Sequence, residues 1–185
     1  MSQIVIFASG SGTNAEAIIR YFSPKSGVVQ AIFCNNPTAG VLEKAEALGV
    51  PVELFDKNQL HDGDVLERLK KYQPDLIVLA GFLWMYPASL LKVFPKVINI
   101  HPALLPKYGG KGMYGNRVHE AVLEAKESHT GITIHYVNEH YDEGAIIAQF
   151  ETSIAECTTA ACIAAKVHAL EQAYFPQVID QLLHA

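Results

Sequence analysis

The sequence predicts an α/β fold in which helices cover both faces of a mostly parallel sheet of about seven strands. Short β-branched runs alternate with amphipathic stretches over the first 80 residues, and glycines or prolines separate them. Strands that alternate with helices are joined by right-handed crossovers, which make neighbouring strands parallel. Half of the 185 residues are apolar and only 18% are charged, which excludes a disordered chain. At ~100–200 residues per domain, we expect a single domain over residues 1–185.

The first strand and the first helix have the clearest patterns. Residues 4–8 form a continuous apolar run of strand length, and a glycine turn follows at residues 10–12. Apolar residues then recur at helical spacing from Ala15 to Phe22, and Pro24 ends the pattern. The same alternation predicts strands over residues 28–34, 52–55 and 76–80, and helices over residues 41–48 and 65–72.

The second half of the chain has a less regular pattern. The Pro/Gly-rich stretch 102–115 is too long for an ordinary connection, so it predicts a functional loop. A final helical region opens at Thr158; Pro176 should break it, and it should resume and run to Leu183. We also expect a short helix over residues 88–94, a fifth strand over 97–101 and a helix over 117–125. The runs 130–137 and 145–151 predict a β-ribbon or two adjacent strands at a sheet edge.

Charge and cysteine content exclude several classes of protein. The chain has 14 Lys+Arg against 19 Asp+Glu, a net charge of −5, whereas nucleic-acid binding usually needs a basic face. Three cysteines without a CxxC pair neither build a disulfide framework nor match zinc-finger spacing, which favours a reducing cytoplasm. The longest apolar run, residues 76–86, is about half of the ~20 residues that a membrane span needs. The N-terminus opens with Met1-Ser2-Gln3 rather than with a basic signal-peptide region, so we expect an unprocessed cytoplasmic protein.

The first candidate site is the turn Gly10-Ser11-Gly12-Thr13-Asn14, between the first strand and the first helix. Two glycines let the backbone approach a ligand, and a helix N-terminus favours an anion, so the turn predicts a site for a single phosphate. A plain strand-to-helix turn is the alternative. NAD is not expected, because the third glycine of G-x-G-x-x-G and an acidic residue after the second strand are both absent.

The second candidate site is Asn99-Ile100-His101-Pro102, at the end of the fifth strand. Residues 99 and 101 share a face of the strand, at the sheet edge where parallel sheets bind ligands. They form either a hydrogen-bonded core pair or a catalytic pair, in which Asn99 donates to an oxyanion and His101 moves protons. Asp142, before Glu143-Gly144, is by itself most often a turn former. Beside His101 it would raise the pKa of the imidazole and favour its protonated form.

Other chemistries find less support in the sequence. His135 lies on a predicted strand between apolar residues, as a supporting residue for the site. The remaining histidines lack the i, i+4 spacing of a helical metal site, so no metal is expected. Gly-x-Ser-x-Gly is absent around Ser9 and Ser11, and no cysteine lies next to a candidate base, which disfavours covalent catalysis.

Taken together, these motifs resemble those of the folate-dependent formyltransferases. The block Asn-x-His-Pro-x-x-Leu-Pro, followed about 35 residues later by His and Asp, is the most specific part of the similarity. The resemblance implies a single Rossmann-like formyltransferase domain. It also implies transfer of a formyl group from 10-formyltetrahydrofolate to the amine of 5-phosphoribosylglycinamide, giving the N-formyl product and tetrahydrofolate, in de novo purine biosynthesis. The matching segments are residues 9–14, 79–82, 99–106, 131–135 and 142–144.

The resemblance implies a role for each candidate residue. Residues 10–14 hold the substrate phosphate, Asn99 and protonated His101 stabilise the oxyanion, and Asp142 supports protonated His101. Trp84 departs from the family, which often has arginine there beside the pterin. The implied folate-binding residues are Leu83, Trp84, Met85, Tyr86, Asn99, Asn138, Glu139, His140, Tyr141 and Asp142, and the implied glycinamide-binding residues are His168, Ala169, Leu170 and Glu171.

Relatives with the same motifs provide the alternatives. Formyltetrahydrofolate hydrolase shares the trio but carries an extra N-terminal domain, whereas residue 4 already begins the first strand here. Methionyl-tRNA formyltransferase needs a C-terminal domain and a basic surface. A nonenzymatic nucleotide-binding module would retain the turn but not the trio. We expect small-molecule partners, no nucleic acid and no membrane, neither a metal nor NAD, and a monomer or a homodimer.

Overall fold

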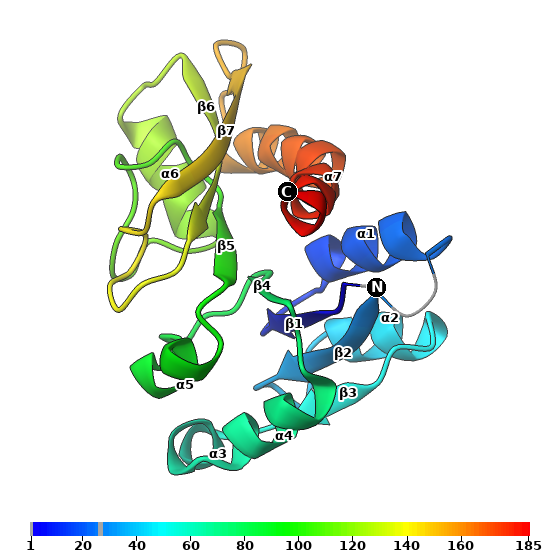
Figure 1. Cartoon of the computed structure of the whole chain (residues 1–185). Helices are drawn as coiled ribbons and strands as arrows, with labels where there is room; N and C mark the ends of the chain where they lie inside the picture. Colours follow the sequence, from blue (N-terminus) through cyan, green and yellow to red (C-terminus); the bar gives the residue numbers. More distant parts are fainter. Residues whose placement is uncertain (1, 26–27) are drawn as a thin grey trace. The chain divides into compact units, whose positions relative to one another are not determined.

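The computed structural model describes residues 2–25 and 28–185, and their strands form a seven-stranded sheet in the order β3-β2-β1-β4-β5-β6-β7 (Figure 1). By its contacts the chain divides into two compact units, residues 1–98 with 180–185 and residues 99–179. The strand order and the parallel pairing around β1 confirm the predicted α/β fold class. The single domain over residues 1–185 stays a prediction.

Four parallel strands form the sheet of the unit that contains residues 1–98. Strand β1 (Ile4–Ala8) pairs with β2 (Val29–Cys34) and with β4 (Leu76–Leu79), and β2 pairs with β3 (Val52–Leu54). Every residue of β1 is buried, as its continuous apolar run predicts. Aromatic rings fill part of this core: Phe7 and the Phe33 ring stack with their centroids 5.1 Å apart.

The helices of this unit include one that the sequence analysis missed. They are α1 (Thr13–Phe22), α2 (Val41–Ala47), α3 (Lys57–Asp62), α4 (Asp64–Tyr72) and α5 (Ala88–Val93). Helix α3 was not predicted, although its signal is present: Asp56 and Gln59 form a capping box at its start. The other four helices were predicted from the spacing of apolar residues and are confirmed.

An antiparallel ribbon is the main sheet element of residues 99–179. Strand β5 (Val97–His101) leads into this unit, and helix α6 (Asn116–Glu124) follows. Strands β6 (His129–Tyr136) and β7 (Ile146–Ser153) then pair antiparallel, which confirms the predicted pair of adjacent strands, with β7 at the sheet edge. Helix α7 (Ala160–His184) closes the chain.

Pro176 does not break the last helix, contrary to the sequence expectation. Helix α7 is 25 residues long and continues through Pro176. A proline inside a helix removes one backbone hydrogen bond and costs ~3 kcal/mol or more. Here Pro176 is buried together with Phe175 and Ile179, and Gln177 Nε2 donates to the carbonyl oxygen of Ala173 at 2.8 Å. The apolar burial on both sides of the proline offsets the lost bond.

A disulfide joins Cys157 and Cys162, so the expectation that the cysteines form no disulfide was wrong. Cys157 lies between β7 and α7, and Cys162 lies in the first turn of α7. The turn brings their Cα atoms to 5.5 Å, which is within the range of disulfides. Cys34 is buried and not bonded. Within residues 2–25 and 28–185, no helix is long and apolar enough to cross a membrane.

Candidate active site

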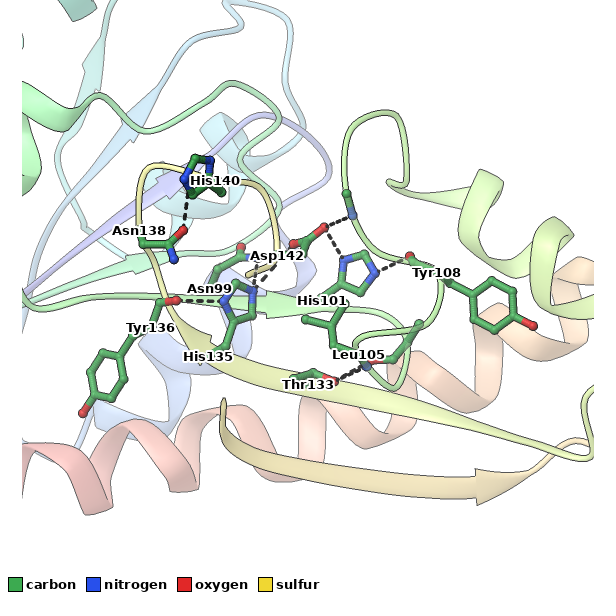
Figure 2. A network of polar contacts seen from close by, with 12 residues as sticks. Asn99, His101, Leu105, Tyr108, Thr133, His135, Tyr136, Asn138, His140 and Asp142 are labelled. Atoms are coloured by element: carbon green, nitrogen blue, oxygen red, sulfur yellow. Dashed lines mark hydrogen bonds and ion pairs between the residues drawn. The ribbon is translucent and has the colours of Figure 1, made fainter. Parts of the chain in front are cut away.

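Asn99, His101, His135 and Asp142 point toward one another at the end of β5 (Figure 2). All four belong to the unit of residues 99–179. His101 is 3% exposed and His135 is 2% exposed, so both imidazoles are enclosed by protein. The structure therefore brings together the trio and the supporting histidine that the sequence singled out. In the described part of the chain, no group of three or more His, Cys, Asp or Glu residues could hold a metal ion.

His135 orients the side chain of Asn99. Its Nδ1 lies 2.9 Å from the carbonyl oxygen of Tyr136. Because a carbonyl only accepts, Nδ1 carries the proton and Nε2 of the neutral ring has the lone pair. Nε2 therefore accepts from Asn99 Nδ2 at 3.1 Å. The carboxamide of Asn99 has a second N–H, which can donate to a substrate oxygen.

Both ring nitrogens of His101 face oxygen atoms. Nε2 donates to the carbonyl oxygen of Tyr108 at 2.7 Å, and Nδ1 lies 3.5 Å from Asp142 Oδ2. Burial lowers the pKa of His101 below its ordinary value, although Asp142 and the Tyr108 carbonyl act to raise it. The expectation of a raised pKa was thus right about the effect of Asp142 and wrong about the net direction. At neutral pH the ring is uncharged, with its lone pair on Nδ1.

Asp142 is held in its ionised form. Burial acts to raise the pKa of this carboxyl, but His101 and the Gly110 N–H act to lower it, and the net pKa is lowered. Gly110 N donates to Oδ2 at 3.0 Å, and Oδ1 lies 3.6 Å from His135 Nε2. A proton taken up at His101 Nδ1 would therefore lie next to a carboxylate. His101 and Asp142 can therefore hold one proton between them. A group transfer from one nitrogen to another needs such a site, because the attacking nitrogen loses a proton and the leaving nitrogen gains one.

The loop over residues 102–115 supplies two backbone groups that the sequence analysis missed, the Tyr108 carbonyl and the Gly110 N–H. Both residues have positive φ, 56° and 95°. The Tyr108 hydroxyl donates to Glu127 Oε1 at 2.8 Å, and Lys107 Nζ binds the same oxygen at 3.0 Å. The run of glycines after Tyr108 was the signal in the sequence, because glycine tolerates such backbone angles. The loop thus contacts His101 and Asp142 directly.

Thr133 and Gln149 anchor the backbone that follows His101, and they too were missed. The two residues are directly opposite in the β6–β7 ladder. Thr133 Oγ1 donates to Ala103 O at 2.7 Å and accepts from Leu105 N at 3.0 Å. Gln149 Nε2 donates to Thr133 Oγ1 at 2.9 Å and to Leu105 O at 3.0 Å. A polar pair at facing positions of two predicted strands was the available signal.

The turn of residues 10–14 lies at the N-terminus of α1, in the unit of residues 1–98. Gly12 has φ of 75°, and a Cβ there would lie 2.5 Å from Val41 Cγ2, so only glycine fits. Lys44 Nζ donates to the carbonyl oxygen of Ser11 at 2.6 Å. This lysine, which the sequence analysis did not select, brings a positive charge to the turn. A helix N-terminus with an adjacent cation suits an anion.

The first segment expected to bind folate, residues 83–86, also lies in this unit. Leu83 is half exposed, and its N–H donates to Ser9 Oγ at 3.1 Å. The Trp84 ring packs edge-on against Phe82, with centroids 6.5 Å apart. Tyr86 is 2% exposed and burial raises the pKa of its hydroxyl, which has no hydrogen-bond partner among the described residues. Trp84 thus belongs to an aromatic cluster with Phe55 and Phe82.

The second folate segment, residues 138–141, precedes Asp142 in the other unit. The His140 N–H donates to Asn138 Oδ1 at 2.8 Å, which closes a turn (Figure 2). Glu139, His140 and Tyr141 are exposed. The turn therefore offers both backbone groups and side chains to a ligand next to Asp142.

His168 and Glu171, in the segment expected to bind glycinamide, form a pair on α7. Glu171 is 5% exposed, and its Oε2 lies 2.8 Å from His168 Nδ1, which raises the pKa of that imidazole. Ala169 is exposed and Leu170 half-buried. His119 on α6 is 5% exposed, and burial lowers its pKa while Glu171 acts to raise it. The sequence analysis did not select His119, because a lone histidine on a buried helix face carries no motif.

Comparison with known proteins matches residues 2–179 to the formyl transferase family model. A protein named phosphoribosylglycinamide formyltransferase, from Bacillus subtilis, is 36% identical over 99% of this chain and 95% of its own length. Chloroplastic proteins of the same name are 38% identical in Arabidopsis thaliana and 36% identical in Vigna unguiculata. This chain spans 65% and 60% of the length of those two relatives.

Solved structures give the same result. The crystal structure of phosphoribosylglycinamide formyltransferase from Bacillus halodurans has a TM-score of 0.88 and 35% identity, and the match covers 98% of this chain and 95% of that one. The protein of the same name from Anaplasma phagocytophilum has a TM-score of 0.90 and 30% identity, with 99% and 87% covered. Sequence and fold thus lead to one family over nearly the whole chain.

Proposed function

Because the chain belongs to the formyl transferase family, we propose that it transfers a formyl group from 10-formyltetrahydrofolate to the amine of 5-phosphoribosylglycinamide. The products are the N-formyl compound and tetrahydrofolate, in de novo purine biosynthesis. The observation that carries this proposal is the enclosed cluster of Asn99, His101 and Asp142, which pairs a carboxamide donor with a proton-holding imidazole and carboxylate. Relatives that carry the glycinamide name favour that amine as the acceptor.

Asn99 stabilises the charge that forms first. The glycinamide amine attacks the formyl carbon, and the electron pair of the C=O bond moves to the oxygen. The amide of Asn99, oriented by His135, donates its second N–H to this oxyanion. Such an oriented donor typically lowers the barrier by about 2.7–4 kcal/mol. Direct attack needs no protein nucleophile.

His101 and Asp142 move the proton. The attacking amine must lose a proton, and the folate nitrogen must gain one when its bond to the formyl carbon breaks. Neutral His101 accepts this proton at Nδ1, and the ionised Asp142, 3.5 Å away, stabilises the imidazolium. The proton then passes to the departing folate nitrogen, which returns both groups to their starting state.

Each part of the substrates has its own proposed binding segment. The turn of residues 10–14, with Lys44 beside it, holds the phosphate, because the net charge of −5 gives an anion no general attraction. Residues 83–86 and 138–141 bind the folate, with Trp84 in the place of a polar contact. Residues 168–171 meet the glycinamide, and Glu171 holds its amine.

Membership of the family also bears on domain organisation, localisation and partners. We propose that residues 1–185 act as one formyltransferase domain in the cytoplasm, on small molecules alone, as a monomer or a homodimer. The reaction uses 10-formyltetrahydrofolate as cosubstrate and needs neither a metal nor NAD.

A single assay tests the proposal. Purified protein is mixed with 10-formyltetrahydrofolate, with and without phosphoribosylglycinamide, and the release of tetrahydrofolate is followed together with the formylated product. We expect turnover only when the glycinamide is present. Turnover that ignores the glycinamide would instead identify a formyltetrahydrofolate hydrolase, and absence of turnover in both reactions would overturn both readings.

A further inference from the structure

The Cys157–Cys162 disulfide includes none of the residues assigned to the proposed reaction. It closes the turn between β7 and α7, in the unit of residues 99–179. Both cysteines are half-buried, so reagents in solution can reach them. Cys34, in contrast, is buried in β2 and unpaired. The chain thus has one accessible sulfur pair and one enclosed thiol.

We propose that Cys157 and Cys162 form a reversible thiol–disulfide exchange site, whose co-reactant is a dithiol reductant. The cytoplasmic setting proposed above is reducing, yet the two cysteines are bonded. In such compartments disulfides are usually transient and sense or transmit redox state. A bond that opens and closes with the supply of reductant reconciles these two observations.

The two sulfurs have different roles in the exchange. Cys162 lies in the first turn of the 25-residue α7, where its N–H donates to Thr159 Oγ1 at 3.2 Å. The positive end of the helix dipole stabilises a thiolate on Cys162, whereas Cys157 lies outside the helix next to the Glu156 carboxylate. Cys162 is therefore the better leaving group, and Cys157 the sulfur that is attacked.

Each step balances its electrons. A thiolate of the reductant attacks Cys157 Sγ, the disulfide bond breaks, and its electron pair leaves on Cys162 Sγ. The second thiolate of the reductant attacks the mixed disulfide and releases Cys157 as a thiolate. The protein disulfide has gained two electrons and two protons, and the dithiol has become a disulfide.

Other contacts hold the turn when the bond opens. Lys166 Nζ donates to the carbonyl oxygen of Ser153 at 2.9 Å and pairs with the Glu156 carboxylate. Ile163, in the first turn of α7, is fully buried. Reduction therefore loosens the start of the helix without unfolding the protein, as a reversible exchange requires.

The state of this bond should affect substrate binding, a consequence that rests on the proposed function. His168 and Glu171 lie further along the same helix and are proposed to meet the glycinamide. Because the disulfide restrains the start of α7, its reduction weakens the order of this segment. We expect reduction to raise KM for phosphoribosylglycinamide about fivefold, at the low end of couplings between sites, and to leave KM for the folate unchanged.

The chemical arm of the test needs no enzyme activity. The full chain is equilibrated in mixtures of reduced and oxidised dithiothreitol, quenched with acid, and alkylated under denaturing conditions for intact mass. In a Cys34→Ser background we expect no free thiol at the oxidised end, two at the reduced end, and full reversal. Free thiols that persist under oxidation, or a bond that yields only after unfolding, would overturn the exchange site. In the native reduced protein, faster alkylation of Cys162 than of Cys157 is expected, and equal rates contradict their assigned roles.

The kinetic arm compares KM values of the oxidised and reduced protein. Cys157→Ser and Cys162→Ser should both behave like the reduced protein under oxidising conditions, and Cys34→Ser should still respond to reduction. Equal glycinamide KM values in the two states would overturn the coupling to α7. If the chain formylates no glycinamide at all, the proposed function fails, while the mass measurements still decide the exchange site by themselves.

Discussion

Replacement of Asp142 by asparagine removes one negative charge and little else. The amide oxygen of Asn can still accept the N–H of Gly110, which Asp142 Oδ2 accepts at 3.0 Å. The side chain keeps its size, so the loop of residues 102–115 should stay in place. What the variant loses is the charge 3.5 Å from Nδ1 of His101. It therefore separates the electrostatic role of Asp142 from its role in holding the loop.

The size of the expected effect follows from this distance. With an effective dielectric constant of ~20, two unit charges at 3.5 Å attract each other by about 5 kcal/mol, an upper limit for the support that the imidazolium receives. General acid–base catalysis typically contributes ~10²- to 10⁴-fold in rate, which corresponds to about 3–5 kcal/mol. The two figures agree, so we expect Asp142→Asn to lower kcat by ~10²- to 10⁴-fold.

The pH dependence gives the readout that a structural defect would not change. Protonation removes the lone pair of His101, so activity of the unaltered protein should fall as the pH drops through the lowered pKa of this group. In Asp142→Asn only the Tyr108 carbonyl still opposes the effect of burial on the pKa of His101, so the midpoint should move to still lower pH. Rates of formyl transfer over a pH series, with an NMR titration of His101, measure both.

The matched control is Glu143→Gln, which removes the adjacent, exposed carboxylate. It changes the net charge equally and should leave both kcat and the midpoint close to their original values. Were Asp142→Asn to lose activity with no movement of the midpoint, Asp142 would act only by holding the loop. The assigned proton role would then be refuted.

Three further changes test other parts of the site. Gly12→Ala should lower the free energy of unfolding by ~1–3 kcal/mol and raise KM for the phosphorylated substrate, because the added Cβ would meet backbone and side-chain atoms of Val41. Gly10→Ala is the control, because a Cβ at that position meets no atom within 4 Å. Equal urea midpoints for the two variants would contradict this. Lys44→Gln should raise KM for phosphoribosylglycinamide by about two- to fivefold and leave KM for the folate unchanged; an equal change in both would argue against a phosphate role. Thr133→Val should lower the free energy of unfolding in urea by ~1–3 kcal/mol and lower kcat, because the Leu105 N–H loses its acceptor. Thr133→Ser keeps the hydroxyl and should restore both values. If it does not, the loss comes from packing.

The order of strands and helices could be predicted because its signals are local. The apolar run of β1 and the helical spacing that ends in Phe22 both depend on neighbours within a few residues. Pro176 shows the limit of such signals. A proline normally ends a helix, but burial of Phe175 and Ile179 on either side keeps α7 intact. The low helix propensity of proline is overcome where tertiary packing contributes more stabilising free energy than the lost hydrogen bond costs.

The candidate trio could also be named from the sequence, since Asn99 and His101 share a face of one strand and the family resemblance adds Asp142. The backbone groups that contact the trio could not be predicted. The acceptor for His101 Nε2 is the carbonyl of Tyr108, a group that every residue has and that no side-chain motif reveals. The same holds for the N–H of Gly110 on Asp142. A backbone group becomes part of a site only through the path of the loop that carries it.

By itself, the sequence determined the α/β order of elements through its hydrophobic periodicity, and its resemblance to the formyltransferases singled out Asn99, His101 and Asp142 as the candidate trio. Only the tertiary structure decided the charge of His101 in the resting protein and the pairing of Cys157 with Cys162. The physical reason is common to both. Burial and proximity depend on residues that the fold brings together, and a charge in the interior responds to its enclosure at least as strongly as to the partner that the sequence places beside it.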